Sequence, residues 1–208
     1  AEKTYKYLVL DNEQADKSMF NKEAYDGVII TPIDKIVVTS TTHLPALELL
    51  NVHESLVGFP GNDYVSSEKI RNQIDIGKVR ELGGNESLNT EVLLEIKPNL
   101  VVGYSVDGNN KALETIRNSG IPVIYNGDWV EKSPLAKAEW IKFFGVLFGK
   151  EKEANSIFNK IESDYLEAKT LASKAETQPT VLCGAMHKDI WYLPNGTSPE
   201  AQILNDAS

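Results

Sequence analysis

Four short, continuous apolar runs, separated by helical patterns, constrain the fold of this chain more than any other feature. They occupy residues 35–40, 55–59, 99–105 and 121–126. Strands of a parallel sheet are covered on both faces, so they read as continuous rather than alternating apolar runs. The pattern predicts an α/β fold with a doubly wound parallel sheet and right-handed crossovers between its strands.

The segments between these runs have helical periodicity and recognisable ends. Helices are predicted at 45–50, 89–97 and 110–120. Asn89 or Thr90 can cap the second helix, and Pro98 closes it. Gly120 is placed to terminate the third helix before the next strand. These signals support strand–helix–strand units.

The alternation stops after residue 129, which indicates a change in architecture. Residues 134–148 read as one helix. Lys150 to Lys174 reads as a second, connecting helix, roughly 37 Å long at 1.5 Å per residue. Thr180 to Met186 then begins a new strand, so the chain is expected to stop inside a second lobe. The predicted segments are an N-terminal hairpin extension (1–30), a first α/β binding lobe (31–133), connecting helices (134–178) and the start of a second lobe (179–208).

Charge and cysteine content exclude several classes of protein. The chain has 21 Lys and Arg against 30 Asp and Glu, a net charge of −9. This argues against sequence-independent binding of nucleic acid, which depends on neutralising phosphates. The single cysteine, Cys183, excludes an internal disulfide framework, and its place in a predicted strand favours a buried structural thiol. The sequence has no apolar run near the roughly 18 residues of a membrane span, and the chain as given carries no basic-then-apolar signal segment.

Ligands of an open parallel sheet bind outside the carboxyl ends of its strands. The loops at these ends combine aromatic, hydroxyl and carboxylate side chains, which suits a sizeable, partly polar organic ligand. The opening of the second lobe adds a histidine and a tryptophan. The candidate ligand-binding residues are Thr41, Thr42, His43, Asn62, Tyr64, Tyr104, Asp128, Trp129, His187 and Trp191.

Motifs for catalysis and for metal binding are weak. The sequence has no G-x-G-x-x-G, no Walker A loop and no G-x-S-x-G elbow. Its carboxylates are spread over helices, without a close pair suited to acid–base work. His43 and His187 are weak metal candidates, because both follow predicted strands but no histidine pair has helical ligand spacing. We therefore expect no enzyme, no resident cofactor and no bound metal ion.

The order of these motifs resembles the substrate-binding proteins of iron-siderophore and cobalamin ABC importers. The resemblance runs from about Thr31 to Pro194 and rests on "KIVVTS", "SLVGF", "KPNLVVG", "GIPV" and "GVLFGKEKEA". Three positions depart from the family pattern: Asn51 in place of Gly, Thr90 in place of Leu, and Asn99 in place of Asp. None of them removes a feature that the fold requires.

The resemblance implies a function. Such proteins have two α/β lobes joined by one long helix and deliver a metal chelate to a membrane permease. A ferric siderophore is expected first, then cobalamin, then haem. The match also implies that Glu91 docks on permease arginines. It implies a monomer in the periplasm or another extracytoplasmic space, with a lipid anchor as an option.

Two other classes of function stay open at this point. A chelatase-like enzyme on the same fold would need a metal-handling pair in the cleft, for which only His43 and His187 are candidates. A receptor for free zinc or manganese would need several His and carboxylate ligands, of which the sequence offers few. Visible absorbance separates these classes, because ferric chelates and corrinoids are coloured and bound zinc is not.

Overall fold

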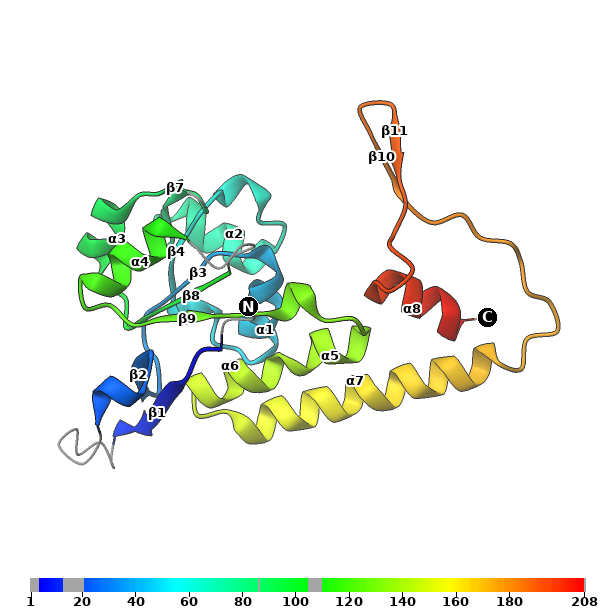
Figure 1. Ribbon diagram of the computed structural model, residues 1–208, viewed down its shortest axis with the longest axis horizontal. Helices are drawn as coiled ribbons and strands as arrows, with labels where there is room; N and C mark the ends of the chain where they lie inside the picture. Colours follow the sequence, from blue (N-terminus) through cyan, green and yellow to red (C-terminus); the bar gives the residue numbers. More distant parts are fainter. Residues whose placement is uncertain (1–3, 13–20, 86, 105–109, 208) are drawn as a thin grey trace. The chain divides into compact units, whose positions relative to one another are not determined.

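The chain forms two compact units. The computed structural model describes residues 4–12, 21–85, 87–104 and 110–207. The first unit comprises residues 1–126 and 144–151, and the second comprises residues 127–143 and 152–208. The two units are described separately below, with the labels of Figure 1.

A five-stranded parallel sheet forms the centre of the first unit (Figure 1). Its order is β5-β4-β3-β8-β9, so the chain runs outward from β3 in one direction and then returns to its other side. The strands are β3 (Ile36–Val38), β4 (Leu56–Phe59), β5 (Arg80–Glu81), β8 (Leu100–Gly103) and β9 (Val123–Tyr125). Four of them lie within the four apolar runs. The predicted doubly wound parallel sheet is confirmed.

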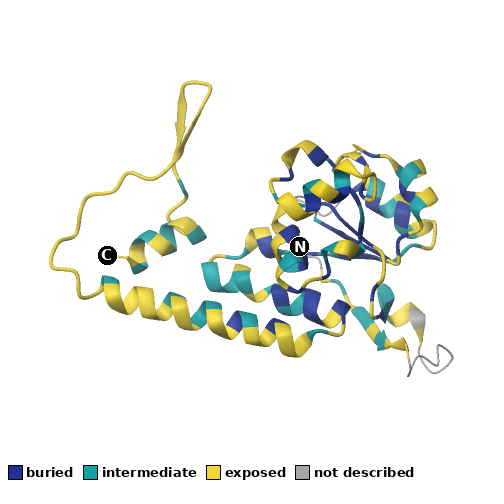
Figure 2. Ribbon diagram, turned by 180° about the vertical axis from the view of Figure 1, so that it is seen from behind, coloured by how far each residue is buried: buried dark blue, intermediate teal, exposed yellow. Residues whose placement is uncertain are grey.

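Helices cover both faces of this sheet, which explains why four of its five strands are apolar (Figures 1 and 2). Helices α3 and α4 pack on one face, where Leu93 and Leu113 join the core formed around Val37 and Val101. Each such buried side chain contributes about 1.5–3 kcal/mol relative to an exposed one. The helices of this unit are α1 (Leu44–Leu49), α2 (Glu68–Asp75), α3 (Thr90–Ile96) and α4 (Lys111–Asn118).

The helix ends follow the sequence signals. Asn89 caps α3, because its side chain accepts a hydrogen bond from the backbone N–H of Val92. Gly120 follows α4 with φ of +92°, a left-handed conformation that glycine adopts without strain. Helix α2 was not predicted, although Ser67 caps it by accepting from Ile70 N–H. Its low apolar content explains the omission, because Ile70 and Ile74 are the only apolar residues among its eight.

The predicted N-terminal hairpin is wrong. Strands β1 (Tyr7–Asp11) and β2 (Gly27–Thr31) pair in parallel, whereas the arms of a hairpin pair antiparallel. Burial raises the pKa of Tyr7 to about 12, against the opposing effect of the backbone N–H of Tyr125, which donates to its hydroxyl at 3.2 Å. This bond joins the N-terminal segment to β9, the edge strand of the main sheet.

Short elements complete the first unit. The two-residue strands β6 (Gly83–Gly84) and β7 (Ser87–Leu88) pair antiparallel. Single 3-10 turns are η2 (Lys22–Ala24), η3 (Thr41–His43), η4 (His53–Ser55) and η5 (Asn62–Tyr64). Two of these turns, η3 and η5, directly follow the strands β3 and β4.

Helices dominate the second unit. Its main element is α7 (Glu151–Ala172), a continuous helix of 22 residues, or roughly 33 Å. Each of its ends lies within two residues of the corresponding end of the predicted helix, Lys150 to Lys174. The predicted helix at 134–148 is instead divided at Trp140, whose indole N–H donates to Glu131. The pieces are α5 (Pro134–Glu139) and α6 (Ile141–Leu147), preceded by η6 (Asp128–Val130); the last four residues of α6 belong to the first unit.

The end of the chain departs from the predicted strand at 180–186. The antiparallel pair β10 (Ala185–His187) and β11 (Ile190–Tyr192) begins only at Ala185. Cys183 precedes it and is exposed, so the prediction of a buried thiol in a strand is wrong. The last helix is α8 (Pro199–Asp206). Asp206 joins it to α7 by accepting from the hydroxyl of Tyr165 and from Lys169 Nζ, each at 2.7 Å.

Candidate functional site

A cavity of about 440 Å³ lies at the carboxyl edge of the main sheet. Loops that follow β3, β4 and β8, together with the β6–β7 turn, form its wall. The lining residues are Thr39, Ser40, Thr41, Phe59, Pro60, Gly61, Tyr64, Gly83, Gly84, Asn85 and Tyr104. The order of the strands reverses between β3 and β8, and ligands of open α/β sheets bind at such a switch point. We call this feature the carboxyl-edge cavity.

Three of the predicted ligand-binding residues line this cavity: Thr41, Tyr64 and Tyr104. The ring of Tyr64 is 81% exposed, so it projects from the rim rather than into a core. Tyr104 is partly buried at the end of β8. The loop 105–109, which we expected beside it, lies outside the described residues. Exposed aromatic faces provide contact area for a ligand at little cost in rotamer entropy.

The β6–β7 turn is a part of the wall that the sequence reasoning missed. Gly83, Gly84 and Asn85 line the cavity through this turn. The Gly-Gly-Asn tripeptide is a turn signal and could have been recognised as one. Its position beside the cavity depends on β5, a strand too short to be seen in the sequence.

The side chain of Glu81 connects two segments of the cavity wall. Its carboxylate accepts from the backbone N–H groups of Gly61, Asn62 and Gly83, at 2.8, 2.7 and 2.8 Å. Burial by itself raises the pKa of Glu81, but these backbone donors outweigh it and hold the pKa below its usual value. The ionised carboxylate therefore fixes the loop after β4 to the turn after β5.

Two polar candidates next to the cavity do not line it. Thr42 is exposed, and its backbone N–H and hydroxyl both bond to the hydroxyl of Ser40. Asn62 is buried, and Arg71 Nη1 donates to its backbone oxygen at 2.8 Å. These residues shape the loops after β3 and β4.

His43 does not face the cavity, contrary to our prediction. Its side chain is 0% exposed, and its ring packs against Phe144 with centroids 5.8 Å apart. It sits at the end of η3, where the chain turns inward to begin α1. His43 is therefore a core residue, and its burial also removes it as an accessible metal ligand.

The remaining candidates belong to the second unit. Asp128 is buried in η6, whereas the neighbouring Trp129 is 42% exposed. His187 in β10 is exposed, as is Trp191 in β11, at 45%. Neither tryptophan is packed in a core. Their role in ligand binding stays a prediction.

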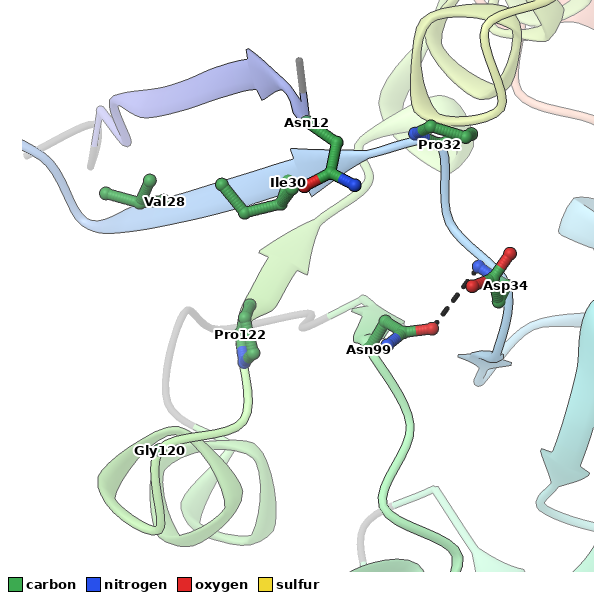
Figure 3. Close-up of a pocket in the computed structure, with 8 residues that line it drawn as sticks. All are labelled: Asn12, Val28, Ile30, Pro32, Asp34, Asn99, Gly120 and Pro122. Carbon is green, nitrogen blue, oxygen red and sulfur yellow. Dashed lines mark hydrogen bonds between the residues drawn. The ribbon is translucent and has the colours of Figure 1, made fainter. Parts of the chain in front are cut away.

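A second cavity, of about 460 Å³, lies at the opposite edge of the same sheet (Figure 3). Val28 and Ile30 of β2 line it together with Pro122, and the Oδ1 atom of Asn99 accepts from the backbone N–H of Asp34 at 3.2 Å. Although slightly larger, it lies at the amino ends of the strands. The carboxyl-edge rule favours the other cavity as the candidate site.

The described ranges contain no group of three His, Cys, Asp or Glu side chains close enough to hold a metal ion. Among the same residues, no helix is both long and apolar enough to cross a membrane. Glu91 is exposed in the first turn of α3, where the helix dipole stabilises an acidic side chain.

Residues 36–208 match the family described as periplasmic binding protein. The chain belongs to this family. Among curated relatives, this periplasmic binding protein is 25% identical to the uncharacterized lipoprotein MJ0878 of Methanocaldococcus jannaschii over 96% of the chain and 50% of that protein. A second match, the uncharacterized protein MJ0642 of the same organism, is 26% identical over 78% of the chain and 51% of that protein. The chain thus spans about half the length of these relatives.

Solved structures share the fold of this periplasmic binding protein at low sequence identity. The siderophore binding protein BauB, solved with two molecules of acinetobactin and ferric iron, has a TM-score of 0.64 at 16% identity, covering 85% of this chain and 60% of that one. The periplasmic heme-binding protein RhuT from Roseiflexus sp. RS-1 has a TM-score of 0.64 at 19% identity, covering 83% and 63%. The resemblance identified in the sequence is confirmed. The family and these neighbours are binding proteins rather than enzymes.

Proposed function

We propose that this protein is the substrate-binding component of an ABC importer and captures a metal chelate of the iron-siderophore type. The observation that carries the proposal is the carboxyl-edge cavity, which lies at the switch point of the sheet in a periplasmic binding protein. Tyr64 and Tyr104 give it aromatic contact surface, and Thr41 adds a hydroxyl group.

Helix α7 supports this mode of binding. A continuous helix of 22 residues is a stiff connection, so hinge motion between the lobes would be small. A binding site that is nearly preformed suits a rigid, bulky ligand, because little ordering is needed when it binds. Ferric chelates and corrinoids both have this character.

The lining of the carboxyl-edge cavity narrows the class of chelate. Its described lining residues include no charged side chain. Arg71 donates to the backbone of Asn62, and Arg80 forms an ion pair with Glu95. A ligand recognised by aromatic and hydrogen-bonding contacts, such as a neutral ferric hydroxamate, therefore fits this wall better than an anionic catecholate. Cobalamin is the second candidate and haem the third.

Delivery to the membrane would use the exposed face around α3. We propose that Glu91 docks on arginine residues of the permease, in a periplasmic setting and with the protein as a monomer. A lipid anchor is consistent with the name of the lipoprotein relative. A chelatase-like enzyme is the alternative of another class. It has less support, because His43 is buried.

Native mass spectrometry of the full-chain protein with ferrichrome, cyanocobalamin and haemin tests the proposal. We expect ferrichrome to be retained, with its visible absorption band accompanying the protein. Retention of cyanocobalamin without any iron complex would reverse the order of the ligands. Retention of none of the three would contradict the proposed function.

A further inference from the structure

The arrangement around Glu81 assigns a role to a residue that does not line the cavity. Its Oε1 atom accepts from the N–H groups of Gly61 and Gly83, both at 2.8 Å, and its Oε2 atom accepts from that of Asn62 at 2.7 Å. The three donors come from two separate loops. One carboxylate thus bridges the turn after β4 and the turn after β5.

Both bridged loops carry wall residues of the carboxyl-edge cavity. Gly61 and Asn62 begin the 3-10 turn η5, which ends at Tyr64. Gly83 begins the β6–β7 turn, which contributes Gly84 and Asn85. Because loops without such bonds sample many conformations, each bridge lowers the entropy that a ligand must overcome on binding.

A second hydrogen bond, to a backbone carbonyl, also restrains the η5 turn. Arg71 of α2 donates from Nη1 to the backbone oxygen of Asn62 at 2.8 Å. Asn62 is therefore held through its N–H by Glu81 and through its carbonyl by Arg71. This leaves the β6–β7 turn as the wall segment that depends most directly on Glu81.

We propose that Glu81 is a positioning residue for ligand binding, which fixes Tyr64 and the β6–β7 turn in the arrangement that a chelate meets. The proposal rests on the proposed function of the carboxyl-edge cavity. It predicts that Glu81 affects affinity without touching the ligand. Charge-assisted hydrogen bonds to backbone N–H groups are among the stronger ones, which suits such a role.

The substitution Glu81→Gln tests this proposal, because an amide has only one acceptor oxygen for the three N–H groups. Glu95→Gln is the matched control: it removes the same charge from the ion-pair partner of the adjacent Arg80. Amide hydrogen exchange is measured at Gly61, Asn62 and Gly83 in the ligand-free protein, and ferrichrome affinity by fluorescence titration. Urea unfolding monitors global stability.

For Glu81→Gln we expect exchange at the three amides to accelerate about tenfold or more and affinity to fall about tenfold, while Glu95→Gln matches the wild type. Glu81→Asp keeps a carboxylate on a shorter side chain, so its exchange rates and affinity should lie between those of the wild type and Glu81→Gln. If Glu81→Gln does not fold, the same measurements on Glu81→Asp test the positioning role. Wild-type affinity in Glu81→Gln, or unchanged exchange at Gly83, would overturn the positioning role. If the wild type binds no chelate, the proposed function fails, while the exchange rates still decide whether Glu81 holds both loops.

Discussion

The ring of Tyr64 lies against the backbone of Gly61, so closely that a Cβ atom added to Gly61 would come 2.9 Å from Cδ2 of the ring. Gly61 also has φ of +75°, where a side chain is strained. The orientation of the aromatic ring at the rim of the carboxyl-edge cavity thus depends on the absence of a side chain three residues earlier.

Gly61→Ala should therefore destabilise the protein and displace Tyr64. The left-handed conformation alone costs roughly 1–2 kcal/mol for a residue with a Cβ atom. Gly77→Ala is the matched control, because Gly77 has φ of +76° with no atom within 4 Å of an added Cβ. Urea unfolding should show a similar loss of stability in both variants, whereas ferrichrome affinity should fall only in Gly61→Ala. Equal affinity in the two variants would show that the position of Tyr64 is unimportant.

The permease contact predicts a loss of transport without a loss of binding. Glu91→Arg should reduce uptake of the chelate in cells at least several-fold. The introduced arginine would repel the permease arginines that Glu91 is expected to contact. Ferrichrome affinity of the purified variant should be unchanged, since Glu91 lies on α3 and does not line the cavity. Glu54→Arg, at another exposed acid, serves as the control. Normal uptake by Glu91→Arg would remove the docking assignment.

Acid should weaken the attachment of α8 to α7. Hydrogen bonds from Lys169 and Tyr165 hold the pKa of Asp206 below its usual value. A carboxyl group whose pKa is lowered by folding stabilises the folded state above its unfolded pKa, near 3.9, and loses that contribution as the pH falls through the lowered folded value. Hydrogen exchange of the α8 amides should accelerate over that acid range in the wild type.

Asp206→Asn removes this pH dependence, and its α8 amides should already exchange faster at neutral pH. Asp189→Asn, at the exposed turn between β10 and β11, should behave as the wild type. An identical acid response in wild type and Asp206→Asn would show that another group controls the docking of α8.

The parallel sheet could be predicted from the sequence, because strands that are buried on both faces appear as continuous apolar runs. Strands β3 and β8 have no polar side chain and are buried at every position, since neither face of the sheet meets solvent there. Strand β5 has no such apolar run, because it has only two residues and both are exposed. Its end positions Glu81, so the residue that bridges the cavity walls was also missed.

Pairing direction and burial of single residues were harder to predict. Strands β1 and β2 resemble the arms of a hairpin in sequence, yet they pair in parallel. His43 follows a strand in the same way as the cavity residue Thr41, but the turn η3 carries it inward against Phe144. Local patterns indicate which loop lies at the site and not which way each side chain points.

The most direct test of the central claim compares the two cavities of the first unit in one binding assay. Tyr104→Ala changes the carboxyl-edge cavity, and Ile30→Ala changes the cavity at the amino edge shown in Figure 3. Each variant of the full-chain protein is titrated with ferrichrome and followed by tryptophan fluorescence. We predict that Tyr104→Ala weakens binding at least tenfold and that Ile30→Ala binds as the wild type does. Weakened binding in Ile30→Ala with wild-type affinity in Tyr104→Ala would contradict the assignment of the carboxyl-edge cavity as the site.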